Sequence, residues 1–156
     1  MPTGWRIVKQ KHAQQAFDGA GARRHGGRWN TPGTSLVYTA QSTSLAILEI
    51  LVHLNRSALL PRYLLIAAHF ADFQVQRLDR GALPSNWRAF PAPPELQRLG
   101  DEWAQGGASL VLDVPSALVG HESNFLINPQ HPDFPSLRID PPIPFEFDFR
   151  LFEWRE

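Results

Sequence analysis

The chain has 156 residues, with 15 basic and 15 acidic side chains and no cysteine. Zero net charge is unlike the basic excess of proteins that bind nucleic acid directly, and the longest apolar run, 45–54, is too short to cross a membrane. Without cysteine there are no disulfides and no thiol chemistry, and the N-terminus shows no secretory signal, so the sequence predicts a cytoplasmic protein.

Short strands and helices alternate along the first half of the chain. In chain order we expect a strand at 5–8, a short helix at 12–17, a glycine-rich loop at 19–30 and a strand at 36–39. Apolar side chains then recur at helical spacing and predict a helix over 43–55, with Ser42 or Ser44 as its N-cap. This is the clearest helix in the sequence.

The second half is richer in strands. We expect a buried strand at 63–70, a proline-rich loop at 80–94, a helix at 95–105 stopped by two glycines, strands at 110–114 and 125–127, and a final strand at 145–151. The final segment alternates over seven residues and gives the cleanest strand pattern. Fourteen prolines keep these elements short, and no repeat or linker divides the chain. The sequence therefore predicts a single α+β domain over residues 1–156.

Two side chains near the first glycine-rich segment suit a ligand that carries a phosphate and a planar cationic ring. Arg28 follows two glycines, and its guanidinium matches phosphate oxygens in a bidentate way. Tyr38 lies on a predicted strand, where its ring can stack on a cation for about 0.5–2 kcal/mol. The alternatives are a solvated basic loop for Arg28 and an ordinary half-buried strand tyrosine for Tyr38.

Glu49 is a carboxylate on the apolar stripe of the predicted helix at 43–55. A buried carboxylate is costly unless it is paired or used. One interpretation is structural: Glu49 pairs with His53, one turn later on the same helix. The other is functional, because a carboxylate that faces a ligand stabilises the positive charge developing on a sugar during N-glycosidic cleavage.

Other motifs predict less. Ser116 follows a predicted strand, but it lacks the surroundings of a nucleophilic serine, so a substrate hydrogen bond or a loop cap is the better interpretation. Asn124 lies close by in the sequence. The six histidines show no metal-ligand spacing, and no dinucleotide fingerprint or phosphate loop occurs. We therefore expect no metal and no resident cofactor.

The motifs and their order together resemble the RES domain, a family named for its arginine, glutamate and serine. The resemblance runs from Trp5 to Leu151. Its motifs are Gly26-Gly27-Arg28-Trp29-Asn30-x-x-Gly33, Tyr38-Thr39-Ala40, Ala46-x-x-Glu49-x-x-x-His53, Leu83-Pro84-x-x-Trp87, Gly100-Asp101-x-Trp103, Val114-Pro115-Ser116, Asn124-x-Leu126-Ile127-Asn128-Pro129-x-His131-Pro132 and Phe147-Asp148-x-Arg150. One departure is Gly120, where the family pattern has a proline.

The resemblance implies a fold like that of ADP-ribosyltransferases: a compact domain of short mixed strands in packed sheets with a few helices. It implies that NAD is a substrate, and that the enzyme depletes NAD by cleaving the nicotinamide–ribose bond, as a glycohydrolase or a phosphorylase. Arg28, Tyr38 and Glu49 match the family's catalytic residues. The implied NAD-binding residues are Arg6, Trp29, Ser116 and Asn124. RES toxins pair with an antitoxin that carries an Xre-type helix-turn-helix domain and blocks the site.

Other functions remain open at this point. The same fold can transfer ADP-ribose from NAD to a protein, and the acceptor can also be water or inorganic phosphate. A catalytically idle module that only binds a DNA-binding regulator is a third interpretation. An RNA-cleaving toxin fits poorly, because the sequence has no net positive charge and no interleaved basic and aromatic residues.

Overall fold

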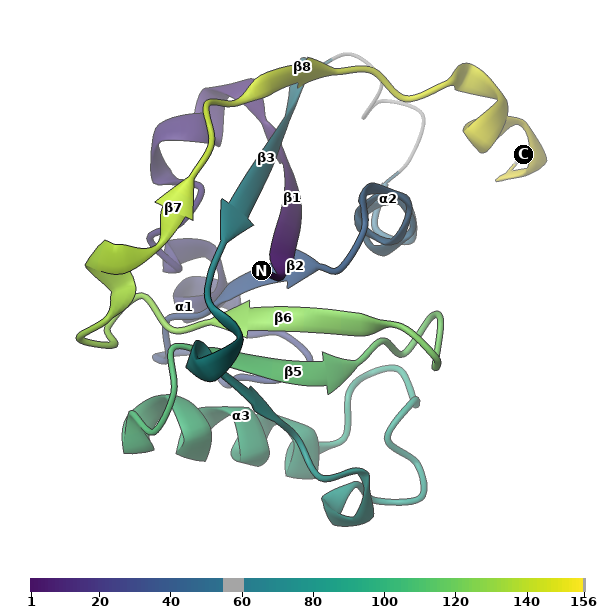
Figure 1. Ribbon diagram of the computed structural model, residues 1–156. Coiled ribbons are helices and arrows are strands. Elements are labelled where there is room, and N and C mark those ends of the chain that lie inside the picture. Colours follow the sequence, from purple (N-terminus) through teal and green to yellow (C-terminus); the bar gives the residue numbers. More distant parts are fainter. Residues whose placement is uncertain (55–60, 156) are drawn as a thin grey trace.

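The computed structural model describes residues 1–54 and 61–155 and, within them, builds one curled eight-stranded sheet (Figure 1). The strands are β1 Thr3–Lys9, β2 Val37–Ala40, β3 Tyr63–His69, β4 Val75–Arg77, β5 Val111–Pro115, β6 Ser123–Ile127, β7 Arg138–Ile139 and β8 Ile143–Phe145. Their order is β4-β5-β6-β2-β1-β3-β7, with β8 also paired to β3. The pairings are antiparallel except that between β4 and β5, which is parallel.

Three α-helices and several short 3-10 helices connect these strands within the described residues. The α-helices are α1 Ala20–His25, α2 Thr43–Leu51 and α3 Pro94–Gly106, and the 3-10 helices are η1 Gln10–Gln15, η3 Asp72–Gln74, η4 Arg80–Ala82, η5 Phe134–Ser136 and η6 Phe149–Arg155. The predicted α+β class is therefore confirmed. Of the helices described, none has the length and apolarity needed to cross a bilayer.

The core lies on both faces of the curled sheet. Inside the curl, side chains from the two halves of the sheet pack together; they include Val8, Ile66, Ala68, Val111 and Ile127. On the outer face, α3 covers β5 and β6 through Leu96 and Trp103, which pack with Leu112 and Leu126. The other helix, α2, covers β1 and β2 through Leu45 and Ala46, which pack with Ile7 and Ala40. Two helices thus flank one continuous outer face.

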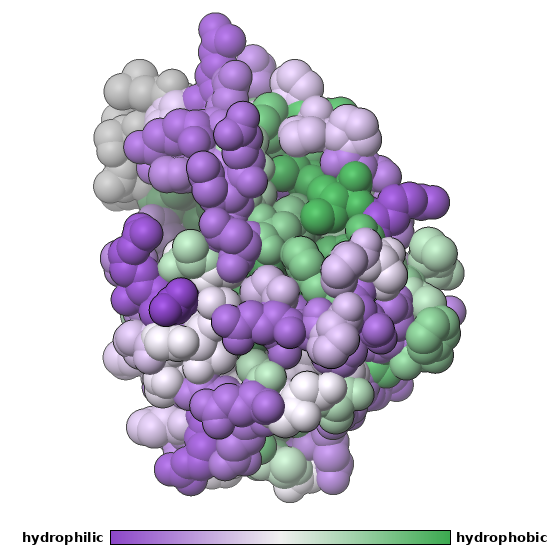
Figure 2. All heavy atoms as spheres, turned by 90° about the vertical axis from the view of Figure 1, so that its left-hand side faces the viewer, coloured by the Kyte–Doolittle hydropathy of each residue, from purple (hydrophilic) through white to green (hydrophobic). Residues whose placement is uncertain are grey.

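Polar side chains cover most of the face that carries η1, α1 and β7. Figure 2 shows this face from the left-hand side of Figure 1, with apolar side chains mainly in its upper part and at its right edge. The neighbouring strands β7 and β8 carry the exposed side chains of Ile139 and Ile143. Scattered apolar exposure of this kind is normal for a protein surface.

The helix predicted at 43–55 exists but is shorter than predicted. It begins after Ser42, whose Oγ accepts a hydrogen bond from the Leu45 N–H at 3.1 Å, so Ser42 and not Ser44 is the N-cap. α2 ends at Leu51, and residue 55 lies outside the described residues. The helix that carries Glu49 is therefore anchored at its start by a cap and along its length by buried Leu45 and Ala46.

The segment 19–30 is not wholly a loop, because α1 lies within it. Gly19 and Gly26 flank this helix with φ of 73° at each, a conformation that side-chain-bearing residues rarely adopt. The Asp18 carboxylate accepts a hydrogen bond from the Ala20 N–H at 2.8 Å at the helix start. The glycines here bound a short helix and do not mark continuous loop, which corrects the prediction.

The prediction of a strand at 145–151 is wrong. β8 ends at Phe145, and the chain becomes 3-10 helix from Phe149. Asp148 Oδ1 accepts a hydrogen bond from the Arg150 N–H at 2.9 Å, and this local turn competes with strand pairing. Phe145 and Phe147 join an aromatic cluster instead, in which the Phe147 ring packs edge-on against Tyr63 at a centroid distance of 5.0 Å.

The contact between α3 and the segment after Arg28 predicts a large stability difference between two glycines of the same helix. A Cβ at Gly100 would overlap the carbonyl group of Trp29, whereas nothing lies within 4 Å of a Cβ at Gly106. We expect Gly100→Ala to lower the free energy of unfolding by about 1–3 kcal/mol through overpacking. Gly106→Ala is the matched control and should leave stability unchanged or raise it. Thermal unfolding of both variants checks this, and equal melting temperatures would contradict it.

Candidate active site

Glu49 and Ser116 meet between α2 and the end of β5. The Ser116 hydroxyl donates a hydrogen bond to Glu49 Oε1 at 2.8 Å. Glu49 is half-buried, while His53, the alternative partner predicted from the sequence, lies beyond the end of α2 and is exposed. The carboxylate is therefore held by a serine 67 residues further along the chain. Its orientation depends on how α2 packs against the sheet.

The Ser116 hydroxyl is fully occupied and fully buried. Its Oγ accepts hydrogen bonds from the N–H groups of Leu118 and Val119, both at 3.1 Å, while its proton goes to Glu49. A hydroxyl has one proton to donate and two lone pairs to accept with, so no bonding capacity is left. Ser116 therefore caps the loop after β5 and orients Glu49, and its surroundings are not those of a nucleophile.

Tyr38 is fixed by a short hydrogen-bond network at its phenol. Its hydroxyl accepts from the Trp29 N–H at 3.0 Å and donates to Asn30 Oδ1 at 2.5 Å. Burial raises the pKa of the Tyr38 phenol well above its ordinary value; the nearby Asp101 carboxylate adds to this, whereas the Trp29 amide and Arg28 oppose it. The phenol is therefore neutral at physiological pH, and its ring is held in one position.

Arg28 lies close to both other groups. Burial lowers the pKa of its guanidinium, whereas the Glu49 carboxylate and then the Tyr38 phenol oxygen act in the opposite direction. Its Nη1 donates to the carbonyl oxygens of Trp87 and Ala89, both at 3.0 Å. An arginine has five donors in a planar fork, so Nε and Nη2 are the donors that suit a phosphate. Arg28 thus binds the loop before α3 and lies within electrostatic reach of Glu49 and Tyr38.

These three groups form a site with one anion, one cation and one neutral aromatic ring. The carboxylate stabilises a positive charge that develops on a sugar, and the guanidinium binds an anionic group on the same molecule. The aromatic ring offers a face for stacking on a planar cation. Together they suit cleavage of a bond between a sugar and a cationic leaving group.

The structure does not bring Arg6 to this cluster. Arg6 projects from the face of β1 opposite to Ile7, and Ile7 packs with α2. Its Nη1 donates to the Tyr38 carbonyl oxygen at 3.0 Å, and its Nε has no hydrogen-bond partner among the described residues. Burial lowers the pKa of its guanidinium, and Asp18 raises it. Its role in NAD binding stays a prediction.

Trp29 and Asn124 differ in what they offer a ligand. The Trp29 ring is 2% exposed and packs in the core beneath α3, so what it gives the site is its backbone N–H to Tyr38. Asn124 is half-buried on β6, paired in register with Ala40 and Val114. Strand alternation places it on the outer face, together with Ala40 and Tyr38. Asn124 is thus the better placed of the two to contact a ligand.

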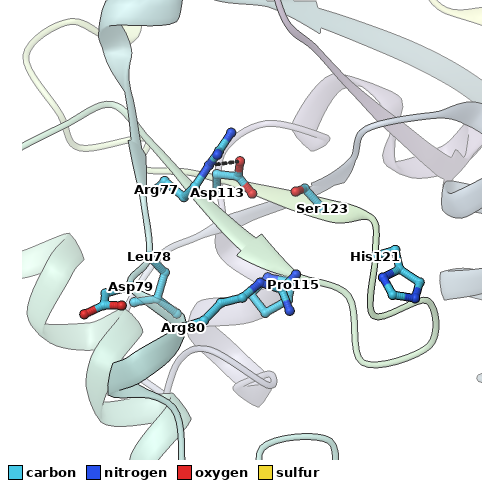
Figure 3. Close-up of a pocket in the computed structure, with 8 residues that line it drawn as sticks. All are labelled: Arg77, Leu78, Asp79, Arg80, Asp113, Pro115, His121 and Ser123. Atoms are coloured by element: carbon cyan, nitrogen blue, oxygen red, sulfur yellow. Dashed lines mark ion pairs between the residues drawn. The ribbon is translucent and has the colours of Figure 1, made fainter.

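A hollow of about 560 Å³ lies elsewhere, on the other face of β5 and β6 (Figure 3). Its lining includes Asp113 and Ser123. Each is next to a residue of the outer face, Val114 or Asn124, and neighbours along a strand point to opposite faces, so the hollow lies on the inner face of the sheet. Its charged groups have partners: Arg77 Nε lies 3.5 Å from Asp113 Oδ2, and Arg80 donates to the Gly120 carbonyl oxygen at 2.9 Å. The Glu49 cluster is therefore the stronger candidate for chemistry.

Sequence reasoning gave no separate role to Asn30, which organises the site from beneath. Asn30 is wholly buried, and its Nδ2 donates to the carbonyl oxygens of Ala22, Thr31 and Thr34 at 2.9–3.1 Å. Its Oδ1 accepts from Tyr38. A buried amide with this many partners fixes the surrounding backbone. The available signal was a polar residue directly after tryptophan in a glycine-rich segment, which alone does not reveal burial.

The Ser116–Glu49 contact predicts an effect on both stability and catalysis. Ser116→Ala leaves two amide N–H groups and one carboxylate without their partner, so we expect a loss of about 1–3 kcal/mol in the free energy of unfolding. For the NAD cleavage that the family resemblance implies, we also expect about a 10-fold loss of turnover, because Glu49 loses its orientation. Denaturant unfolding and an assay of nicotinamide release from NAD measure the two. Ser85→Ala, in an exposed loop, is the control; a Ser116→Ala protein with parental stability and turnover would refute this role.

Fold and site together place the chain in a known class of small α+β proteins. A solved chain of the M. tuberculosis MbcT–MbcA toxin–antitoxin complex superposes with a TM-score of 0.76 at 20% identity, over 93% of this chain and 84% of that one. At that identity the likeness shows a shared fold. The RES domain family model matches residues 3–148, and the chain belongs to the RES domain family. The resemblance read from the sequence motifs is confirmed.

Curated relatives extend this result along most of the chain. "Toxin Res" of Yersinia enterocolitica is 40% identical over 148 residues, covering 94% of this chain and 97% of that protein. "Toxin Res" of Pseudomonas putida is 34% identical over 150 residues, covering 95% and 98%. "Prs ADP-ribosylating toxin" of a Sphingobium species is 43% identical over 135 residues, covering 83% of each chain. The relatives are thus named as toxins.

Proposed function

We propose that this protein is a toxin that depletes NAD by cleaving the bond between nicotinamide and ribose. Nicotinamide leaves with the electron pair of the C–N bond as a neutral base, and the ribosyl carbon becomes cationic. Glu49 stabilises this cation, Arg28 holds a phosphate of the dinucleotide, and Tyr38 stacks on the nicotinamide ring. Attack by water gives a glycohydrolase and attack by inorganic phosphate gives a phosphorylase.

The observation that carries this proposal is the orientation of Glu49. Its carboxylate is held by a buried serine, within electrostatic reach of Arg28, on a helix whose other contacts are apolar. A carboxylate that served only a surface role would not need a buried partner on another element. The membership of the RES domain family supports the same chemistry.

The direct test is to incubate the purified protein with NAD and measure nicotinamide release, with and without inorganic phosphate. Release that needs phosphate identifies a phosphorylase, and release without it a glycohydrolase. No release under either condition would contradict the proposal and favour the idle binding module. The reaction needs no metal in this mechanism, so chelator should leave the rate unchanged.

A second candidate is transfer of ADP-ribose from NAD to a protein side chain. It is favoured by one relative, which is named as an ADP-ribosylating toxin. The first half of the chemistry is the same, and only the acceptor differs. NAD labelled in its adenylate part separates the two, because transfer leaves the label on protein and degradation leaves it in small molecules.

A cognate antitoxin is the partner that we propose, with the Xre-type helix-turn-helix domain that the family resemblance implies. The related solved fold comes from a toxin–antitoxin complex. Exposed apolar side chains also surround the candidate site: Leu48 precedes Glu49, Leu118 follows Ser116 by two residues, and Phe90 is 81% exposed. Exposed apolar groups around a functional site suit a surface that a partner covers. Co-purification with the product of the adjacent gene, and loss of nicotinamide release in that complex, test this.

A further inference from the structure

One face of α3 contacts the segment 27–31, which carries Arg28. Gln97 Nε2 donates to the carbonyl oxygens of Gly27 and Asn30, at 3.1 and 3.3 Å. Asp101 accepts from Thr31 through both carboxylate oxygens: from its N–H at 3.1 Å and from its hydroxyl at 2.6 Å. Residues three and four apart share a helix face, so both side chains point the same way.

Between these two side chains lies Gly100, where the helix backbone approaches the Trp29 carbonyl group closely. A Cβ at this position would overlap the Trp29 carbonyl, so the helix and the loop touch without a side chain between them. This part of α3 has two hydrogen-bonding side chains, Gln97 and Asp101, and between them Gly100, which has no side chain. We call these three residues the α3 platform. Its hydrogen bonds join backbone groups on both sides of Arg28 and Trp29, and one more joins the Thr31 hydroxyl.

The segment held by the platform is the one that carries the arginine and locks the tyrosine of the candidate site. Arg28 lies between the two anchored ends, and the Trp29 N–H and Asn30 Oδ1 fix the Tyr38 hydroxyl. Glu49, by contrast, is placed by α2 and Ser116. The geometry of the site therefore depends on two separate supports, one for the anion and one for the cation and the ring.

We infer that the α3 platform is a positioning device for the reaction, in which Gln97 and Asp101 act through the loop to set Arg28 and Tyr38 against Glu49. This inference rests on the proposed function for its catalytic part. It assigns a role to the Gly100-Asp101 pair, which the sequence motifs single out and the chemistry of the cluster does not use. The Asp101 charge also acts on the Tyr38 phenol, raising its pKa.

The test compares Asp101→Ala with Asp101→Asn, with Thr31→Val and with the double variant Thr31→Val/Asp101→Ala. We expect Asp101→Ala to lower kcat/KM for nicotinamide release by about 10-fold, since it removes two hydrogen bonds to a charged acceptor. Asp101→Asn keeps one acceptor oxygen, so its kcat/KM should be only about 3-fold below that of the parent. The double variant should be no worse than Asp101→Ala, because both single changes break the same contact. Glu102→Gln, exposed on the next position of α3, is the control and should behave as the parent.

Amide hydrogen exchange supplies a readout that does not depend on activity. Asp101→Ala should speed exchange at the N–H groups of Thr31 and Trp29 and leave α2 protected, because only the loop is released. Parental kcat/KM with parental exchange at both amides would overturn the inference. Uniform loss of protection, with activity falling only as the folded fraction falls, would overturn it as well. If the parent itself releases no nicotinamide, the proposed function fails, whereas the exchange measurement still decides whether the platform holds the loop.

Discussion

Glu49→Gln should lower the turnover of NAD cleavage by about 100- to 1000-fold, which is the size of effect seen when one electrostatic stabiliser of a transition state is removed. Glutamine keeps the size of the side chain and an oxygen that can accept from Ser116 Oγ, so α2 and the loop after β5 should keep their places. Only the negative charge is lost. Because NAD in its ground state lacks the ribosyl cation, its dissociation constant should change by less than about 5-fold.

Steady-state nicotinamide release and calorimetric NAD binding measure the two quantities separately. Glu102→Gln removes the same charge from an exposed position and should leave both at the parental values. A Glu49→Gln protein that consumes NAD at the parental rate would remove the basis of the proposed mechanism. Loss of binding together with turnover would instead make Glu49 a substrate-binding residue.

The sequence alone predicts that Glu49 is a paired or functional carboxylate, but it does not predict the partner. A carboxylate among Leu45, Ala46 and other apolar residues of one helix signals a paired or functional group whatever the fold. The choice between His53 and a distant partner needs tertiary structure, because local spacing ranks only neighbours on the same helix. Packing of α2 against the sheet brings Ser116 to the carboxylate and leaves His53 in solvent.

The predictions for the segments 19–30 and 145–151 were wrong for opposite reasons. Glycines at both ends of α1 look like loop residues, yet Gly19 and Gly26 supply the left-handed conformations that bound a helix. The alternation at 145–151 looks like a strand, yet its aromatics pack among themselves and with Tyr63, and Asp148 closes a turn on Arg150. Periodicity indicates which side chains share a face, but it does not show which backbone conformation the segment adopts.

The contacts that hold the segment 27–31 in place were the least predictable part of the site. The α3 platform has helical spacing in the sequence. Its hydrogen bonds, however, are mostly to backbone groups, and the sequence does not show which backbone groups will lie nearby. The role of Asn30 is equally hard to predict, since its side chain is held by carbonyl groups of α1 and of the segment 31–34. Side-chain chemistry could be predicted from residue types, whereas positioning by backbone contacts required the fold.

Arg28→Ala should raise KM for NAD by about 10- to 100-fold, with a smaller effect on kcat. The guanidinium is the charged group that we assign to a phosphate, and a charge-assisted hydrogen bond is worth about 1.5–3 kcal/mol. Arg28→Lys keeps the charge but replaces a planar fork with a single ammonium. Lysine cannot hold the Trp87 and Ala89 carbonyls and a phosphate together, so its KM should fall between those of the parent and the alanine variant.

The matched control is Arg24→Ala, which removes one positive charge from an exposed position at the end of α1. If the segment acted only through its overall positive potential, the two alanine variants would raise KM equally, and more so at low salt. A specific phosphate contact predicts a parental KM for Arg24→Ala at every ionic strength. An Arg28→Ala protein with parental KM would show that the guanidinium serves the loop alone, because its two carbonyl contacts would then account for everything it does.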